Sequence, residues 1–413
     1  MIQEILNEHI VIRDFYISRI KKYIWSPVIK VIIWQRRVWK SYILKTVIQD
    51  LVHTRQFSSD SIFYINKELP LFDHIKTYDD LKSSFTLFKK TAKHKKIFVG
   101  IDEVQEISWW ERFVNWLLAE YGDAIEIFIT WSNSFLLSWE LATYISWRYV
   151  EFYVWPLDFE EFCLFKKQKK TEKIFLEYLK YWWLPWIFRM ERSDETIFNY
   201  LKWVYNTIIL KDIVQHNAVK NTNFFEELYK YTLSNIWNIF SAKSITDYLQ
   251  SQKTKIHTDS VINYLKYAQD AFLLHKVYSV EPDTKKYFEI YNKYYVWDVW
   301  LRNSLVWFDL KKDIGKLLEN YVFLELKRCW YTLKIWRLKS WKEIDFIAEK
   351  NWKIQYFQVC YLLWWEDTIQ REYAPLQEIR DNRPKYVVSM NDIDFGVSEG
   401  IKHIHVMNLS EVL

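Results

Sequence analysis

The residues with the clearest chemistry are Lys40 and Ser41, which stand between two regular elements. Residues 28–33 read VIKVII, a β-branched run typical of a buried strand, and residues 41–53 place apolar side chains at helical spacing. An ammonium group at the start of a helix can bind phosphate oxygens, and a hydroxyl beside it can bind Mg²⁺. This pair therefore predicts a site for a phosphorylated ligand.

The six residues before Lys40 have the length of a phosphate-binding loop. That pattern is G-x-x-x-x-G-K-[ST] between a strand and a helix, and the chain reads WQRRVWKS there. Glycine lets the loop turn its N–H groups onto phosphate, whereas an indole would fill the space. The residues predicted to bind the nucleotide are Trp34, Arg36, Arg37, Val38, Trp39, Lys40, Ser41 and Tyr42.

The composition bears on the same loop. The chain of 413 residues contains 24 Trp and 5 Gly, although average usage predicts roughly 29 Gly. We interpret most Trp as glycine encoded by UGA, and a genuine Trp-rich protein is the alternative. Trp110 is the best candidate for a genuine Trp. The remaining candidates for glycine, all near expected turns or element ends, are Trp131, Trp139, Trp147, Trp155, Trp182, Trp183, Trp186, Trp237, Trp300, Trp307, Trp330, Trp336, Trp341 and Trp352.

A second segment supplies two carboxylates. Asp102 and Glu103 directly follow the apolar run 97–101. In the Walker B form, Asp102 would hold Mg²⁺ directly or through water, and Glu103 would orient or deprotonate an attacking water. Taken singly, an Asp-Glu pair at this place is usually a solvated strand end. Its order and spacing after Lys40 favour nucleotide binding.

With glycine at the Trp positions, the chain resembles a large archaeal and bacterial family of AAA-type ATPases along its whole length. The resemblance implies ATP and Mg²⁺ as cofactors, with Ser41 and Asp102 as metal ligands. It also implies catalytic roles for Glu103, for Asn133 at a sensor position in IEIFITWSN, and for Arg148 in SWRYVEF as a sensing or trans-acting arginine. The alternative is a DNA-binding or protein-interaction module whose nucleotide site is structural or inactive.

Three domains are expected. Residues 1–195 would form a P-loop α/β domain with a parallel sheet, residues 196–295 a helical or winged-helix domain, and residues 296–413 a nuclease-like α/β domain. The middle segment resembles a winged helix, and DNA contact through residues 258–269 is one interpretation. Few Arg or Lys lie on the exposed face of that helix, so a packing module that serves the ATPase is the alternative.

The C-terminal segment resembles the restriction-endonuclease fold. Active members of that fold use a helix Glu, a strand Asp and Glu-x-Lys on the next strand. Glu319 and Asp345 fit the first two roles, but the third element reads Gln358-Val-Cys360. A neutral amide cannot replace the carboxylate, and a thiol cannot replace the lysine. We therefore expect a nuclease-like fold without phosphodiesterase activity, retained for binding.

Two smaller patterns lie in the same segment. Asn351-Trp352 separates two strand-like runs and predicts a type I′ hairpin turn if Trp352 is glycine. His403 and His405 alternate in IKHIHVM and so share one face of a strand. Acidic and Cys partners are missing nearby in the sequence, which favours a surface pair over a metal site.

The remaining composition restricts location and partners. A net charge of +5 does not by itself indicate nucleic acid, and three widely spaced Cys indicate free thiols in a reducing compartment. A cytoplasmic protein without a signal peptide or membrane span is expected, with DNA as a candidate partner and a homo-oligomer as a candidate state. The lysine runs at residues 89–96 and 166–173 are expected to be solvated, and could contact nucleic acid only if the fold groups them.

Overall fold

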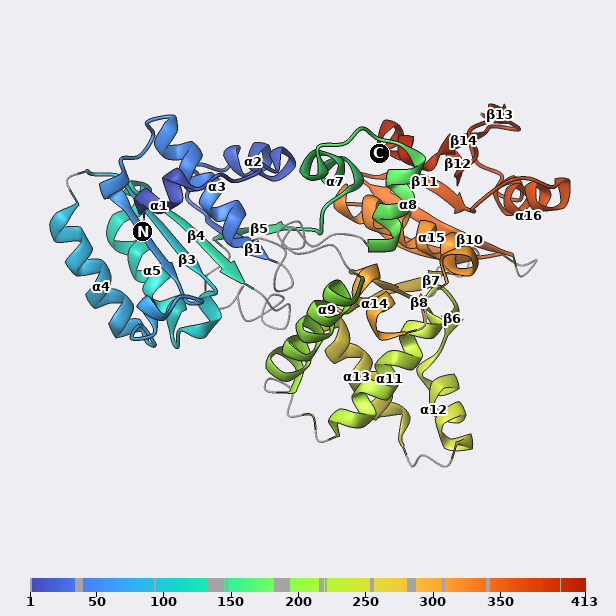
Figure 1. Ribbon diagram of the computed structural model, residues 1–413, viewed down its shortest axis with the longest axis horizontal. Helices are drawn as coiled ribbons and strands as arrows, with labels where there is room; N and C mark the ends of the chain where they lie inside the picture. Colours follow the sequence, from blue (N-terminus) through green and yellow to red (C-terminus); the bar gives the residue numbers. More distant parts are fainter. Residues whose placement is uncertain are drawn as a thin grey trace. The chain divides into compact units, whose positions relative to one another are not determined.

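The computed structural model describes residues 2–33, 40–92, 94–131, 145, 148–181, 194–214, 219, 221–252, 256–280, 287–306, 309–338, 342–393 and 395–413. These residues form two compact units, one ending at Pro156 and the other beginning at Leu157 (Figure 1). Among the described helices, none is both long and apolar enough to cross a membrane.

The first unit contains a five-stranded parallel sheet in the order β2-β3-β4-β1-β5. Its strands are β1 (Ile29–Ile33), β2 (Ile62–Asn66), β3 (Ile97–Asp102), β4 (Ile125–Trp131) and β5 (Tyr149–Tyr153). All residues of β1 to β4 are buried, as parallel strands covered on both faces require. This confirms the predicted α/β fold with a parallel sheet.

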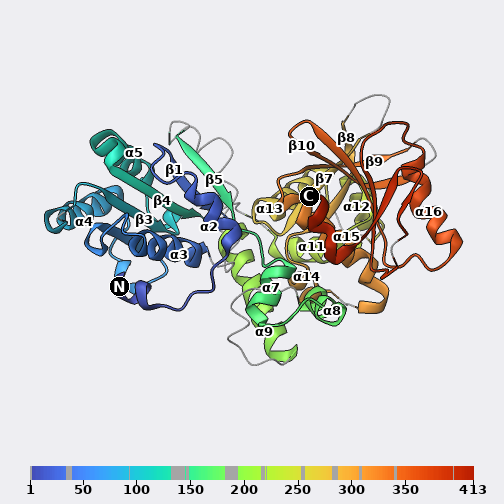
Figure 2. The ribbon, with the colours of Figure 1, turned by 90° about the horizontal axis from the view of Figure 1, so that it is seen from above.

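Helices cover both faces of this sheet, and Figure 2 shows α3 and α5 on opposite sides of it. The helices of the unit are α1 (Ile2–Asn7), α2 (Asp14–Lys21), α3 (Lys40–His53), α4 (Tyr78–Thr91) and α5 (Trp110–Tyr121). Inside the sheet, Lys30 of β1 and Glu126 of β4 form an ion pair in which each side chain is 1% exposed. Burial lowers the pKa of Lys30 and raises that of Glu126. The pair therefore joins two neighbouring strands of the core.

The second unit is built on a nine-stranded mixed sheet in the order β13-β14-β12-β11-β10-β9-β7-β8-β6. Its strands are β6 (Ile239–Phe240), β7 (Leu274–Val280), β8 (Tyr287–Val296), β9 (Thr332–Arg337), β10 (Glu343–Lys350), β11 (Lys353–Val359), β12 (Lys385–Ser389), β13 (Val397–Ser398) and β14 (Ile401–His405). β7 pairs with β9 in parallel, with Val280 beside Trp336. One sheet thus includes strands from both sides of the expected boundary at residue 296.

The helices of the second unit surround this sheet. They are α7 (Phe159–Lys166), α8 (Glu172–Tyr181), α9 (Asp194–Ile208), α11 (Thr222–Asn235), α12 (Ala242–Ser251), α13 (Thr258–Asp270), α14 (Val299–Leu305), α15 (Leu310–Arg328) and α16 (Glu366–Gln377). A π-helix, Ile209–Val214, continues α9. At its start α12 has a capping box, in which the Ser241 side chain accepts from the Ser244 N–H.

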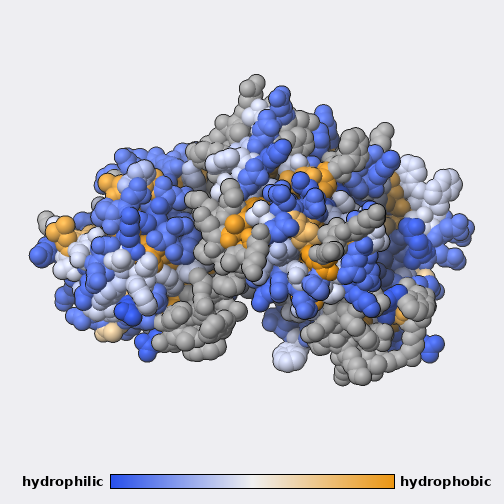
Figure 3. Space-filling model, turned by 90° about the horizontal axis from the view of Figure 1, so that it is seen from below, coloured by the Kyte–Doolittle hydropathy of each residue, from blue (hydrophilic) through white to orange (hydrophobic). Residues whose placement is uncertain are grey.

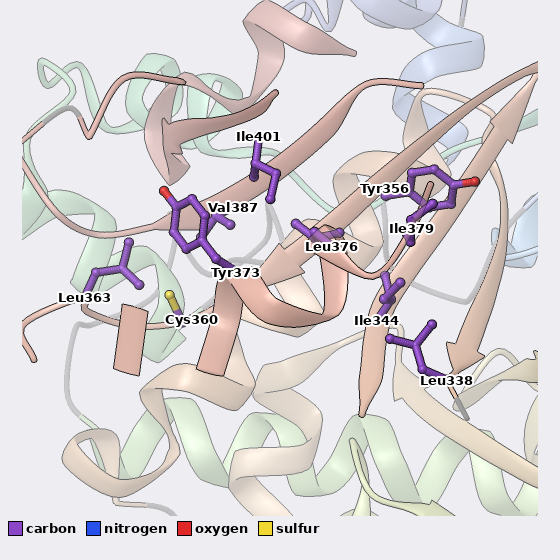
Figure 4. Close-up of a cluster of buried hydrophobic side chains, with 10 residues drawn as sticks. All are labelled: Leu338, Ile344, Tyr356, Cys360, Leu363, Tyr373, Leu376, Ile379, Val387 and Ile401. Atoms are coloured by element: carbon purple, nitrogen blue, oxygen red, sulfur yellow. The ribbon is translucent and has the colours of Figure 1, made fainter. Parts of the chain in front are cut away.

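One core cluster shows how α16 is held on the sheet. Tyr373 and Leu376 of α16, and Ile379 just after it, face strand residues that include Val387 and Ile401 (Figure 4). Leu376, Val387 and Ile401 are fully buried, so this contact removes apolar surface from water on both elements. In the view of Figure 3, hydrophobic residues form separate patches among hydrophilic ones.

The hairpin between β10 and β11 has the predicted two-residue turn. Lys350 pairs with Lys353, and the two residues between them, Asn351 and Trp352, have φ angles of 50° and 65°. Positive φ at both central residues is the mark of a type I′ turn. Trp352 is 96% exposed, so no packing contact holds this residue in the left-handed conformation.

Several other Trp residues have conformations that suit glycine better. Positive φ angles occur at Trp25, Trp109, Trp237, Trp330 and Trp352. A left-handed backbone costs an L-residue about 1–2 kcal/mol, whereas glycine adopts it freely. In addition, the buried indole N–H groups of Trp131, Trp237 and Trp336 have no acceptor among the described residues. By contrast, Trp297 is buried and its indole donates to the Leu274 carbonyl at 3.0 Å.

We predict opposite stability effects for the same change at two exposed Trp residues of the second unit. Trp352→Gly should raise the free energy of unfolding by about 1 kcal/mol because it relieves the left-handed backbone. Trp203→Gly should lower it by about 1 kcal/mol, because Trp203 is 54% exposed within α9 and glycine weakens a helix. Denaturant unfolding of both variants measures this, and a decrease of similar size in both would contradict the conformational argument.

Candidate functional site

The predicted phosphate and metal residues meet at one edge of the parallel sheet. Lys40, Ser41 and Tyr42 form the first turn of α3, which follows β1, and Asp102 is the last residue of β3. β4 lies between β1 and β3. Parallel strands end at the same edge, where open α/β sheets bind their ligands. The sheet thereby brings together residues 62 positions apart in the chain.

Asp102 lies at the centre of this edge and is fully buried. One carboxylate oxygen accepts from the Thr130 hydroxyl, and the other accepts from the Tyr64 hydroxyl at 3.3 Å. Burial raises the pKa of Asp102 to about 6, the charge of Glu103 adds to this, and hydrogen bonds from Ser41 and Thr130 oppose it. The Ser41 hydroxyl and the Asp102 carboxylate are therefore in direct contact.

Glu103 follows the strand in the left-handed conformation, with φ 57°. Its N–H donates to Thr130 Oγ1 at 2.9 Å, which fixes the backbone at this point. The side chain is buried, with Oε1 3.5 Å from Lys40 Nζ and Oε2 accepting from the Gln105 amide. The carboxylate thus lies beside the cation predicted to bind phosphate.

Sequence reasoning missed Thr130 and Tyr64. Both are hydroxyl-bearing residues within mainly apolar strands, β4 and β2, and a hydroxyl near the end of such a strand is the signal that could have revealed them. Thr130 contacts both Asp102 and the backbone of Glu103. It therefore orients both predicted acidic groups.

The other predicted residues fall into two groups. Trp34, Arg36, Arg37, Val38, Trp39 and Asn133 lie outside the described residues. Arg148 is exposed and directly precedes β5, and its carbonyl accepts from the Ile29 N–H at 2.8 Å. Ile29 is the first residue of β1, whereas Lys40 follows the end of that strand. Arg148 thus lies at the opposite edge of the sheet from Asp102, and its predicted role stays a prediction.

In the second unit, Glu319 of α15 and Asp345 of β10 come together as the sequence suggested. Between them lies Lys293 of β8, which sequence reasoning did not single out. Lys293 Nζ is 2.7 Å from Glu319 Oε1, 2.7 Å from Glu343 Oε1 and 3.4 Å from Asp345 Oδ1. Burial alone would lower the pKa of Lys293, but the three carboxylates outweigh it and raise the pKa. A lysine ammonium is therefore the cation of this cluster.

The third element of the nuclease-like pattern has other contacts. The Gln358 amide donates to Glu372 Oε2 at 3.0 Å, and its carbonyl oxygen accepts from the Asp345 N–H at 3.4 Å. Cys360 is buried, and burial raises the pKa of its thiol. Among the residues that the structure describes, no group of three or more His, Cys, Asp and Glu side chains is arranged to hold a metal ion.

The expectation of a surface histidine pair was wrong for His403. Its side chain is only 3% exposed, and Nε2 lies 2.8 Å from the Ser389 hydroxyl. His405 is partly buried, with Nε2 3.9 Å from Asp392. The difference arises because β12 pairs with β14 and its Ser389 lies directly beside this strand.

Comparison with known proteins adds family relationships to this geometry. Residues 26–163 match the family described as AAA domain, and residues 177–316 match a domain of unknown function, DUF8612. An uncharacterized protein of Haemophilus influenzae is 30% identical over 410 residues, which cover 98% of this chain and 99% of that protein. The uncharacterized protein MJ1544 of Methanocaldococcus jannaschii is 29% identical over 390 residues, covering 87% and 82%.

Solved structures resemble the chain only distantly. The Aeropyrum pernix ORC1 protein in complex with DNA has a TM-score of 0.33 and 8% identity, covering 73% of this chain and 95% of that one. AMPPCP-bound DnaA from Aquifex aeolicus has a TM-score of 0.28 and 12% identity, covering 64% and 90%. At these scores the likeness supports no conclusion about function. The near full-length relative and the matched domain together show that the chain belongs to a family of AAA-domain proteins that includes the Haemophilus influenzae protein.

Proposed function

We propose that the first unit binds ATP with Mg²⁺ and hydrolyses it. The observation that carries this proposal is the meeting of Ser41, Asp102, Lys40 and Glu103 at one edge of a parallel sheet. Lys40 would bind the β and γ phosphates, and Glu103 would orient or deprotonate the attacking water. The site would thus provide a cation for the phosphates and a base for the attacking water, which are two of the parts that phosphoryl transfer to water uses.

The donors present fit Mg²⁺. Magnesium in nucleotide sites is usually held by one or two protein oxygens together with substrate phosphates, and Ser41 and Asp102 supply a hydroxyl and a carboxylate in mutual contact. The raised pKa of Asp102 reflects a carboxylate removed from water, whose charged form a cation would stabilise. When bound, Mg²⁺ would neutralise charge on the phosphate oxygens.

The pairing of Lys40 with Glu103 suggests how a nucleotide would prepare the site. Both side chains are buried, and each is the other's charged neighbour at 3.5 Å. Phosphate oxygens would compete for the Lys40 ammonium, because they carry more negative charge than one carboxylate. Glu103 would then be released from its ion pair to accept a proton from water.

We also infer that glycine stands at positions 34 and 39 of the native protein. The support is indirect. Left-handed backbone at five Trp residues, and buried indole N–H groups of Trp131, Trp237 and Trp336 without an acceptor in the described part of the chain, suggest that Trp has replaced glycine elsewhere. Glycine at both loop positions would allow the N–H groups before Lys40 to face phosphate. The mass of the native peptide that spans the loop identifies both residues directly.

The second unit is proposed to contain a winged helix within residues 196–295 and a nuclease-like fold within residues 296–413, which ATP turnover rearranges. The order α11, β6, α12, α13, β7, β8 supports the first part. The meeting of Glu319 and Asp345 supports the second. Lys293 between these two carboxylates is consistent with a fold that does not cleave DNA.

A substitution at Lys40 tests the nucleotide proposal. Lys40→Ala should weaken ATP binding by about 1.5–3 kcal/mol, or about 10- to 150-fold, because a charged hydrogen bond to phosphate is lost. Lys45→Ala is the matched control, since Lys45 lies one turn further along α3 and pairs with Glu8 at 2.8 Å. Titration with a fluorescent ATP analogue and turnover assays of the full chain measure both. Unchanged affinity and turnover in Lys40→Ala would instead favour a DNA-binding or protein-interaction module.

A further inference from the structure

The first unit has a basic hollow at the edge of its sheet opposite the nucleotide site. The hollow has a volume of about 560 Å³ and lies between the end of α3 and the starts of β2 and β3. Positive or hydroxyl-bearing side chains provide most of its polar lining: Arg55, Ser58, Ser59, Ser61, Lys95 and Lys96. The fold thus places the last residues of the lysine run 89–96 against an arginine 40 positions earlier in the chain.

The charged side chains that line this basic hollow are positive. Its described lining contains three permanent cations and no carboxylate. Two acids belong to neighbouring positions: Asp60, between Ser59 and Ser61 in the chain, has Oδ1 3.4 Å from His94 Nε2, and Glu126 forms its ion pair with Lys30. Arg55, Lys95 and Lys96 are all exposed. The charges of Arg55 and Lys95 therefore face solvent, whereas the Lys96 ammonium lies over the Trp25 ring, 3.6 Å from its centroid.

The lining chemistry fits phosphate. Arginine and lysine bind phosphate oxygens through charged hydrogen bonds, and serine hydroxyls can add neutral ones. Phe57, the aromatic member of the lining, is only 5% exposed, so its ring presents little surface to a lipid chain. Lys89 and Lys90, in the last turn of α4, precede the lining residues Lys95 and Lys96 by a few positions in the chain.

We propose that the basic hollow binds the phosphodiester backbone of a nucleic acid. Contacts to phosphate alone do not read the base sequence, so binding is independent of sequence and weakens steeply with salt. The hollow lies at the opposite edge of the sheet from Lys40 and Asp102. Nucleic-acid binding therefore persists in Lys40→Ala, which separates this proposal from the proposed ATPase function.

Fluorescence anisotropy with labelled oligonucleotides, one single-stranded and one duplex, tests the proposal on the full chain. Arg55→Glu with Lys95→Glu should weaken binding at least tenfold and reduce the slope of log affinity against log salt by about two. Lys169→Glu with Lys173→Glu is the matched control, because it changes the charge equally at exposed lysines of the second run. This control should stay within twofold of the parent.

Two further measurements decide the interpretation. Arg55→Gln with Lys95→Gln should reduce the slope of log affinity against log salt by the same amount, with a smaller loss of affinity. Preserved ATP turnover in each variant reports an intact fold. Equal loss in the hollow and control pairs, or no binding by the parent, would overturn the proposal. The proposal would also be overturned if inorganic phosphate displaced the oligonucleotide at a concentration equal to that of the oligonucleotide's own phosphate groups. The ligand would then be free phosphate.

Discussion

Glu103→Gln should reduce ATP turnover at least 100-fold while ATP still binds. The amide keeps the shape of the side chain but cannot accept a proton from water, and loss of a general base typically costs about 10²–10⁴ in rate. Glu103 is 3% exposed and held at the end of β3 through its N–H bond to Thr130. Because the neutral amide no longer competes for Lys40, the lysine proposed to bind phosphate, ATP affinity should not fall.

The control for this variant is Glu106→Gln. Glu106 is exposed and lies only three residues further along the chain, so the same chemical change there should leave turnover at the parent value. Comparison of single-turnover with steady-state rates separates the chemical step from product release. Repeating both measurements with EDTA, which removes Mg²⁺, tests the dependence on the metal. Parent-like turnover in Glu103→Gln would exclude Glu103 as the base.

Lys293→Met should lower the free energy of unfolding of the second unit by about 3–5 kcal/mol, the usual cost of breaking a buried ion pair from one side. Lys293 is 4% exposed, and its removal takes the ammonium away from Glu319, Glu343 and Asp345. Burial already raises the pKa of Asp345, and the Glu319 charge adds to that shift. Hydrogen exchange of β8 and β10 amides measures the effect separately from the first unit.

The control is Lys334→Met, since Lys334 of β9 pairs with Glu349 at 3.3 Å with both side chains part exposed. That pair should contribute less than about 1 kcal/mol. Adding Glu319→Gln and Asp345→Asn to Lys293→Met should restore part of the lost stability, because the carboxylate then left without Lys293 is that of Glu343, which is 30% exposed. Equal losses in Lys293→Met and Lys334→Met would show that the cluster is solvated rather than buried.

The local elements around the nucleotide site could be predicted from the sequence. The β-branched run 28–33 contains β1, the apolar run 97–101 lies within β3, and the helical spacing at 41–53 corresponds to α3. These predictions succeed because periodicity of apolar residues is a local property that burial on a sheet enforces. The meeting of Lys40 and Asp102 followed from them, since parallel strands end at one edge.

Contacts between distant elements could not be predicted in the same way. Thr130 reaches Asp102 only because β4 lies beside β3 in the strand order, and Lys293 reaches Asp345 only because β8 belongs to the same sheet as β10. The lysine run 89–96 gave no indication that Arg55 would lie beside it. Strand order and sheet pairing depend on packing between residues far apart in the chain, which no local pattern encodes.

Residue type and local spacing are enough to predict which polar side chains lie at the ends of β1 and β3 and where a Trp stands in a turn, as the turn at Asn351-Trp352 shows. The contacts of Thr130 and Tyr64 with Asp102, and the position of Lys293 between Glu319 and Asp345, follow from the folded sheets. These side chains are brought together by the sheets, and their burial makes each charge depend on its neighbours.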